Sequence, residues 1–166
     1  MTIPKLGQKN CIRIRVARSA ADMGEAAALF LEYATGLPVD LGFQGFGAEL
    51  AELPGKYAPP EGELLLAGDD VGASLGCVAL RALVDAGICE MKRLYVRPAG
   101  RGLGIGRTLV AAVIAAAEAR GYAEMRLDSL PTMTQAIALY RRFGFVEIPA
   151  YCYNPMPGTI YLAKRL

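Results

Sequence analysis

The sequence of 166 residues contains no histidine, and its four cysteines are widely separated, with no C-x-x-C pair. The absence of histidine excludes the Ser-His and Cys-His mechanisms of hydrolases. The isolated cysteines speak against a zinc site, and we expect no metal. Cys77 and Cys89 stand in apolar, strand-like sequence. We therefore expect buried thiols that pack as small hydrophobic side chains and do not act as nucleophiles.

Long apolar runs are also absent. No stretch reaches the roughly 18 consecutive apolar residues of a membrane span, and residues 1–10 lack the apolar segment of a signal peptide. We therefore expect a cytoplasmic protein without membrane contact, with residues 1–10 as a flexible N-terminus. The composition, 54% hydrophobic and 20% charged, suits one well-buried core. Residues 1–166 are therefore expected to form a single domain.

Hydrophobic periodicity predicts strands and helices along the whole chain, with no linker and no internal repeat. Ser19 with Asp22 forms a capping pair at the start of the first helix, and Thr132 with Gln135 predicts a capping box at the start of the last. A turn is expected at residues 68–70. The predicted strands cover residues 11–17, 63–67, 72–83, 88–96, 124–128, 145–148 and 159–163, and the predicted helices cover residues 19–36, 46–53, 105–120 and 131–144.

A glycine-rich stretch, Arg101-Gly102-Leu103-Gly104-Ile105-Gly106, lies between a predicted strand and a predicted helix. Glycine lets the backbone approach a ligand closely, and the first turn of a helix presents unpaired N–H groups and a partial positive charge. Five cations gather around this stretch although the formal net charge is only +2, namely Lys92, Arg93, Arg97, Arg101 and Arg107. The pattern predicts a binding site for a phosphate-bearing ligand.

Spacing excludes two other phosphate-binding motifs. A dinucleotide-binding fingerprint starting at Gly102 would place its third glycine at Arg107, although Asp128 stands at the end of the next predicted strand. A P-loop ending at Gly106 would place its first glycine at Arg101.

The pattern Arg-x-x-Gly-x-Gly resembles the pyrophosphate-binding loop of the GNAT superfamily of acyl-CoA-dependent N-acyltransferases. The resemblance covers residues 88–148, where Glu90-Met91-Lys92-Arg93-Leu94-Tyr95-Val96 precedes the loop and Leu139-Tyr140-Arg141-Arg142-Phe143-Gly144-Phe145 follows it. It implies an α/β (α+β) fold, a single GNAT-like domain with a mixed central sheet of about six to seven strands flanked by about four helices. It also implies acetyl-CoA as co-substrate.

The resemblance assigns cofactor contacts to the strand end and the loop. In the family, backbone at this strand end pairs with pantetheine like an added strand, and one N–H polarises the thioester carbonyl. Met133 departs from the family pattern, because many members carry an asparagine there. The cofactor-binding residues implied are Leu94, Tyr95, Val96, Arg101, Gly102, Leu103, Gly104, Ile105, Gly106 and Arg107.

Glu90 is the candidate general base. It lies eleven residues before Arg101, which is the spacing of the base-bearing glutamate in histone-acetylating members of the family. A carboxyl group in an apolar cleft would have a raised affinity for protons, as a base for an ammonium needs. The alternative is a carboxylate on a strand face, paired with Lys92 or Arg126.

Tyr140 is the candidate general acid. It resembles the tyrosine that many members place near the thioester sulfur, where the phenol protonates the departing thiolate. Its helical spacing with Ile137 and Phe143 fits core packing equally well.

Two aromatic and polar segments, residues 37–44 and 151–156, are candidates for the acceptor side, with ordinary loop packing as the alternative. Asp40, next to aromatic side chains, is suited to bind an ammonium, or else to cap a turn. The predicted substrate contacts are Tyr33, Asp40, Phe43, Gln44, Tyr151 and Tyr153.

These features predict an enzyme that moves an acetyl group from acetyl-CoA to a primary amine of a small molecule or amino acid by direct transfer in a ternary complex. A non-catalytic acyl-CoA-binding or sensor module and the acetylation of a protein amine are the alternatives. We expect no nucleic-acid partner, because the basic residues concentrate at one loop. A homodimer is left open.

Overall fold

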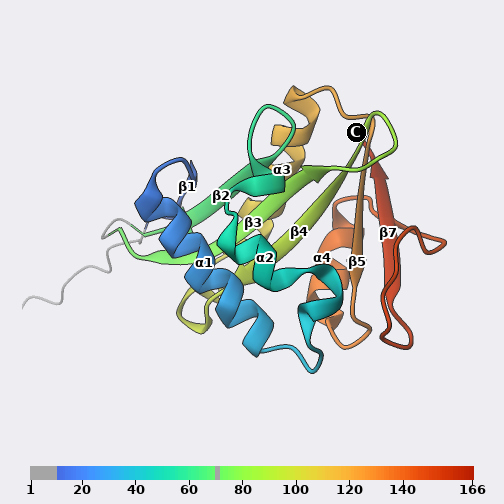
Figure 1. The fold of residues 1–166 in the computed structure, drawn as a ribbon, viewed down its shortest axis with the longest axis horizontal. Coiled ribbons are helices and arrows are strands. Elements are labelled where there is room, and N and C mark those ends of the chain that lie inside the picture. The colour runs from blue at the N-terminus through green and yellow to red at the C-terminus, as the bar shows by residue number, and fades with distance from the viewer. Residues whose placement is uncertain (1–10, 70–71) are drawn as a thin grey trace, which may run out of the picture.

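A seven-stranded mixed sheet forms the centre of the molecule (Figure 1). The structure, a computed structural model, describes residues 11–69 and 72–166; the expected flexible N-terminus and Asp70 of the predicted turn lie outside them. All neighbouring strands are antiparallel except β4 and β5. The spatial order is β1 (Arg13–Val16), β2 (Glu63–Gly68), β3 (Ser74–Ala82), β4 (Ile88–Val96), β5 (Glu124–Ser129), β7 (Ile160–Arg165) and β6 (Val146–Ile148).

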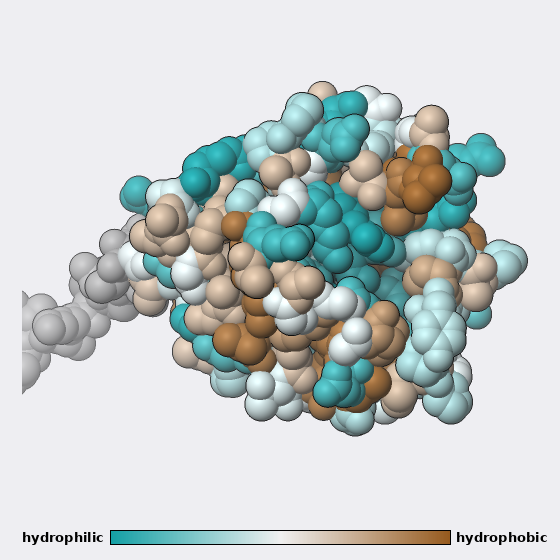
Figure 2. Space-filling view, viewed as in Figure 1, coloured by the Kyte–Doolittle hydropathy of each residue, from teal (hydrophilic) through white to brown (hydrophobic). Residues whose placement is uncertain are grey.

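Helices cover both faces of this sheet. In the view of Figure 1, α1 and α2 lie in front of the strands, whereas α3 and α4 lie behind them. The four α-helices of the described chain are α1 (Ala20–Thr35), α2 (Phe46–Ala51), α3 (Ile105–Ala119) and α4 (Thr134–Arg142), and short 3-10 turns cover η1 (Leu41–Gln44), η2 (Gly55–Tyr57) and η3 (Pro98–Gly100). The predicted mixed α/β fold is confirmed. Figure 2 shows hydrophilic residues gathered over the middle of the front face, beside α2.

The sequence predicted the cap of the first helix correctly and the cap of the last helix incorrectly. The predicted capping box of α1 is confirmed, because the Ser19 side chain accepts from the backbone N–H of Asp22 and the Asp22 carboxylate accepts from that of Ser19. The predicted capping box of α4 is wrong. Pro131 and Thr132 form a turn closed by a bond from the N–H of Met133 to the carbonyl of Leu130, so the helix begins only at Thr134.

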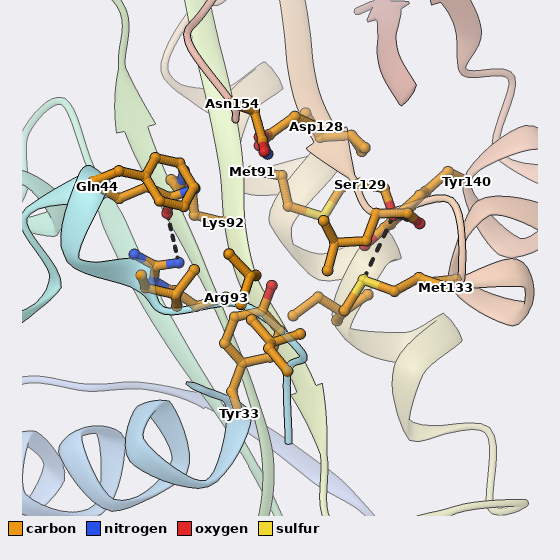
Figure 3. A pocket seen from close by; sticks show the side chains of 18 residues that line it. Tyr33, Gln44, Met91, Lys92, Arg93, Asp128, Ser129, Met133, Tyr140 and Asn154 are labelled. Carbon is orange, nitrogen blue, oxygen red and sulfur yellow. Dashed lines mark hydrogen bonds between the residues drawn. The ribbon is translucent and has the colours of Figure 1, made fainter. Parts of the chain in front are cut away.

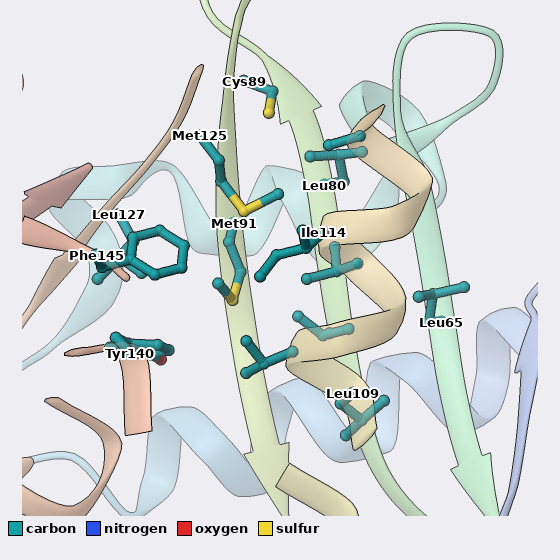
Figure 4. Close-up of a cluster of buried hydrophobic side chains, with 14 of the residues drawn as sticks. Leu65, Leu80, Cys89, Met91, Leu109, Ile114, Met125, Leu127, Tyr140 and Phe145 are labelled. Carbon is teal, nitrogen blue, oxygen red and sulfur yellow. The ribbon is translucent and has the colours of Figure 1, made fainter. Parts of the chain in front are cut away.

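Two hydrophobic clusters lie on opposite faces of the sheet. One contains Leu29 and Phe30 of α1, and the other contains Leu109 of α3 (Figure 4). The strand β2 contributes to both, because Leu64 packs under α1 while its neighbour Leu65 packs under α3. The central strands are therefore buried on both faces, which fixes their register.

The cysteines Cys77 and Cys89 are fully buried in these clusters, as predicted. Their thiols lie 3.3 and 3.4 Å from the backbone carbonyl oxygens of Arg93 and Glu124. Burial raises the pKa of the Cys77 thiol and raises the pKa of Cys89 to about 12. Both thiols are therefore unsuited to nucleophilic chemistry.

The strands β4 and β5 diverge toward one end of the sheet (Figure 1). Their ladder has three pairs and ends at Glu90 and Arg126, while β5 stays paired with β7 as far as Ser129. The ladder between β3 and β4 shifts register opposite this point, and Arg93 has a φ of 58° there. This left-handed residue marks a bulge that bends β4 away from β5. The divergence leaves room for a site between the two strands.

No helix within residues 11–69 and 72–166 combines the length and the apolar character that crossing a membrane requires.

Candidate active site

The loop before α3 presents open backbone. Gly102 and Gly104 have φ values of 78° and 77°, a region that favours glycine. A Cβ atom added to either residue would meet no other atom within 4 Å. Gly104 is the N-cap of α3 and supplies no side-chain hydrogen bond. The first turn of α3 therefore offers uncapped N–H groups to a ligand.

A groove of about 720 Å³ runs along this loop and the end of β4. Its opposite side is formed by residues 132–136, the end of the preceding turn and the first residues of α4. The sequence did not predict that this segment as a whole contacts the cofactor. Leu103 and Arg107 are exposed and do not line the groove. The other predicted cofactor residues do line it, namely Leu94, Tyr95, Val96, Arg101, Gly102, Gly104, Ile105 and Gly106.

Three of the five cations noted around the loop are engaged by carboxylates of the protein itself. The pairs are Lys92 with Glu90, Arg93 with Glu49, and Arg97 with Glu32. Arg101 lies at the loop, where its Nε donates a 3.2 Å hydrogen bond to the carbonyl of Val96. Most of the cations near the loop are thus paired with carboxylates of the protein, and Arg101 is the one of the five that lines the groove.

A smaller pocket of about 70 Å³ adjoins the groove at the gap between β4 and β5 (Figure 3). One wall is residues 91–94 of β4 and the other is residues 127–130 at the end of β5. The groove and the pocket share the lining residues Tyr33, Leu37, Leu94, Met133 and Ala136. A ligand in the groove can therefore meet one in the pocket.

Tyr140 of α4 lines this pocket and also packs in the core. Its ring, 8% exposed, meets Phe145 edge to face at 5.9 Å (Figure 4). Its hydroxyl has no hydrogen-bond partner in the described chain. Since no fully buried polar side-chain atom of the described chain lacks a partner, this hydroxyl is not fully buried and must be accessible from the pocket. Burial raises the pKa of Tyr140, and the nearby Asp128 adds to this. The side chain thus combines core packing with a hydroxyl available as a proton donor.

Glu90 lies beside the pocket without lining it. Its carboxylate is 0% exposed; Arg81 Nε donates to Oε1 at 2.9 Å, and Lys92 Nζ lies 3.6 Å from the same oxygen. Burial alone would raise the pKa of Glu90, but these cations and a tyrosine hydroxyl hold it below its usual range. The expected raised proton affinity is wrong, and the alternative pairing with Lys92 is confirmed. Arg126, the other partner considered, bonds to Glu124 at 2.6 Å.

Three of the predicted substrate residues line the pocket, namely Tyr33, Phe43 and Gln44. The amide oxygen of Gln44 accepts a 2.9 Å hydrogen bond from Arg93. Burial raises the pKa of Tyr33, so its hydroxyl stays protonated beside the gap.

The other three predicted substrate residues take different positions. Asp40 caps η1 by accepting a 2.6 Å hydrogen bond from the N–H of Gly42, as the capping alternative anticipated. Tyr153 is 75% exposed, and Tyr151 bonds to Glu90. None of the three lines the pocket.

Asp128 and Asn154 line the pocket but were not predicted as substrate residues. Nδ2 of Asn154 donates to Oδ2 of Asp128 at 2.9 Å, and its Oδ1 accepts from the N–H of Met156 at 3.0 Å. In the sequence, Asp128 was noted only for its position at the end of a predicted strand, and it was considered there only as part of a dinucleotide-binding site.

The carboxylates of Glu90 and Asp128 and the thiol of Cys152 lie within 4.8 Å of one another. Burial raises the pKa of Cys152 to about 11, and the two carboxylates add to this. The thiol is therefore neutral at pH 7, and metal-binding cysteines are thiolates. Because Glu90 is also occupied by its own partners, the cluster does not offer a metal three free ligands.

Comparison with known proteins finds related sequences and similar folds. A family model described as an acetyltransferase (GNAT) domain matches residues 60–147. An uncharacterized N-acetyltransferase of Schizosaccharomyces pombe is 42% identical over 155 residues, which cover 93% of this chain and 95% of the relative. One of Dictyostelium discoideum is 30% identical, with 91% and 97% covered. The crystal structure of a GNAT-family acetyltransferase from Staphylococcus aureus superimposes with a TM-score of 0.77 at 20% identity and covers 93% of this chain and 99% of that chain.

Proposed function

Because this chain belongs to the GNAT family of acetyltransferases, we propose that it transfers the acetyl group of acetyl-CoA to the primary amine of a small molecule. One observation carries the proposal. The groove over the uncapped N-terminus of α3 opens into the pocket between β4 and β5, and Tyr140 lines the pocket while its neighbour Leu139 lines the groove.

The groove fits the parts of coenzyme A in order. The pyrophosphate suits the loop of Gly102 and Gly104, where N–H groups, the partial positive charge of α3 and the side chain of Arg101 favour an anion. The pantetheine arm suits residues 94–96. Because the ladder between β4 and β5 ends at Glu90, this edge of β4 has no strand partner there and is available to an extended ligand.

The residues of the chain would bind the two substrates, exclude water and move protons. Acetyl-CoA supplies the acetyl group as a thioester. Tyr140 is protonated at neutral pH because burial raises its pKa, and its unpaired hydroxyl is suited to give a proton to the departing sulfur. The assignment of Glu90 as general base stays a prediction, although its lowered pKa and its pairing weaken it.

The full chain, purified and mixed with acetyl-CoA and a panel of amines, tests the function. We expect free thiol to appear with at least one amine, as read by a thiol reagent, and the acetylated amine to appear by mass spectrometry. Thermal stabilisation by acetyl-CoA without thiol release for any amine, amino acid or peptide would instead support a binding module. The absence of both stabilisation and turnover would overturn the proposal.

A further inference from the structure

Asp128 brings into the pocket a carboxylate that no lysine or arginine of the described chain contacts. Its carboxylate, half-buried at the end of β5, accepts one hydrogen bond, from Asn154 at 2.9 Å (Figure 3). Within residues 11–69 and 72–166, no lysine or arginine nitrogen lies within 4.0 Å of it. A carboxylate can accept about four hydrogen bonds, so most of its capacity is left for a ligand.

None of the titratable groups that face Asp128 is a cation. Glu90 is ionised, because its own cations lower its pKa. The neighbouring tyrosines and the cysteine are neutral at pH 7, because burial raises their pKa values. The groups are Glu90 of β4, Tyr33 of α1, Tyr140 of α4, Tyr151 and Cys152 before β7, and Tyr161 of β7.

The two cations that line the pocket are already committed. The ammonium of Lys92 lies 3.6 Å from the Glu90 carboxylate. The guanidinium of Arg93 donates two hydrogen bonds to Glu49, from Nε at 2.9 Å and from Nη2 at 2.8 Å. A carboxylate on a ligand would therefore have to compete with Glu90 and Glu49 for these cations, whereas an ammonium would find a carboxylate with no cation in contact.

We propose that Asp128 binds the acceptor as an ammonium ion and then takes its proton, and that the acceptor is an aliphatic primary amine with no carboxylate next to the nitrogen. This inference rests on the proposed acetyl transfer. The remainder of the pocket suits an apolar stem, since it is lined by Leu37, Val39, Leu41, Phe43, Leu127 and Leu130. The ring of Tyr33 adds an aromatic surface to the same pocket.

The proton balance of the step is complete with groups at this site. Asp128 takes one proton from the ammonium, and the freed lone pair forms the C–N bond to the thioester carbon while the carbonyl π pair moves to oxygen. When the carbonyl reforms and the C–S bond breaks, the sulfur gains a proton from Tyr140, and the second proton lost by the nitrogen restores the Tyr140 hydroxyl. One proton leaves through Asp128, so the products are the amide, the thiol and one proton.

Matched pairs of acceptors test the substrate class on the unmodified protein. Pentylamine and norleucine differ only by a carboxylate beside the nitrogen, as do 2-phenylethylamine and phenylalanine. We expect kcat/KM for each amine to exceed that for its amino acid by roughly 100-fold, because the amino acid carboxylate would enter without a partner. Amino acids used as well as their amines would overturn this inference and leave the acetyl transfer intact. Turnover of no amine at all would overturn both.

Substitutions test the residue. Asp128→Asn keeps the side-chain shape and removes the charge, and we expect acceptor kcat/KM to fall by roughly 100-fold and to lose its acidic limb in the pH profile. The KM for acetyl-CoA and the rise in Tm that it causes should stay as in the unmodified protein, which also reports that the variant is folded.

Two further variants make the comparison specific. Asp85→Asn carries the same change in the exposed turn between β3 and β4 and should leave all constants unchanged. Glu90→Gln should retain the acidic limb. The inference would be overturned if Glu90→Gln lost the acidic limb of the pH profile while Asp128→Asn kept it, or if Asp128→Asn were fully active. Either result would mean that another group is the base.

Discussion

The hydroxyl of Tyr151 donates a 2.7 Å hydrogen bond to Oε2 of the buried Glu90. This bond connects the segment before β7 to the first part of β4, on the far side of β5. The ring of Tyr151 also meets Tyr161 edge to face at 5.7 Å. Three residues further along, Asn154 holds the carboxylate of Asp128. Glu90 and Tyr151, which the sequence predicted as base and substrate contact, thus bond to each other. Their bond helps to position the segment whose Asn154 lines the pocket.

Tyr151→Phe removes this bond without changing the ring. We expect the free energy of unfolding to fall by about 1.5 to 3 kcal/mol, the range for a hydrogen bond to a charged group. The KM for the acceptor should rise while that for acetyl-CoA stays within about twofold, because only the pocket side moves. Urea denaturation and both Michaelis constants measure this. Tyr122→Phe, which removes a hydroxyl bonded to the Glu61 carbonyl away from the groove, is the control. Equal effects of both variants would contradict the positioning role.

Gly104→Val tests the loop at the start of α3. The φ of 77° makes any side chain strained there, and the added atoms would enter the open groove. Gly121→Val is the matched control, because Gly121 has a φ of 79° and equally open surroundings but does not line the groove. We expect each variant to lose about 1 to 3 kcal/mol of stability from backbone strain.

Only Gly104→Val should abolish the rise in Tm caused by millimolar acetyl-CoA, because only that side chain occupies ligand space. Thermal melts with and without acetyl-CoA measure the rise. If Gly104→Val kept the rise in Tm, or if both variants lost it, the result would contradict a specific role of the loop in cofactor binding.

Tyr140→Phe tests proton donation to the sulfur. Because the hydroxyl has no protein partner in the described chain, its removal should change stability by less than about 0.5 kcal/mol. We expect kcat to fall by roughly 100-fold, with the affinity for acetyl-CoA unchanged. Single-turnover rates and calorimetric titration measure the two quantities. Full activity of the variant would mean that Tyr140 only packs in the core and does not donate the proton.

Local patterns in the sequence predicted the parts of the fold that depend on neighbouring residues. The capping box of Ser19 and Asp22 and the loop of Gly102 and Gly104 form as expected, because each needs only a few consecutive residues. The prediction from Thr132 was wrong because Pro131 and Thr132 lie in a turn, closed by the bond from the N–H of Met133 to the carbonyl of Leu130, and do not start a helix. Two local signals competed there, and the turn prevailed.

The pocket depended on contacts that no short pattern records. Arg81 reaches Glu90 across the hairpin of β3 and β4, and the resulting pairing reverses the expected direction of the Glu90 pKa. Asp128 becomes a pocket residue because β5 separates from β4 after Arg126 while it remains paired with β7. Strand order and register are set by the whole sheet, so a residue's position along the chain could not reveal them.

The ion pair of Glu49 with Arg93 should couple stability to pH. Glu49 lies on α2 and is buried, and its carboxylate accepts from Tyr57 at 2.7 Å and from Arg93 at 2.9 and 2.8 Å. Burial would raise its pKa, but Arg93, Tyr57 and Lys56 outweigh burial and lower the pKa to about 2. A lowered folded-state pKa gives stability that is present above the unfolded-state pKa, roughly 4.3, and that is lost as the pH falls toward 2.

Glu49→Gln should therefore lower the free energy of unfolding by about 3 to 5 kcal/mol at pH 7, because it leaves the buried Arg93 uncompensated. The difference between this variant and the unmodified protein should shrink steadily below about pH 4, as Glu49 itself becomes protonated. Urea denaturation at a series of pH values measures the difference. Glu147→Gln, which breaks the exposed pair with Arg141 at 3.7 Å, should change stability by less than about 1 kcal/mol at any pH. A Glu49→Gln difference that stays constant from pH 7 to the acid limit would mean that the carboxylate is not held ionised by Arg93.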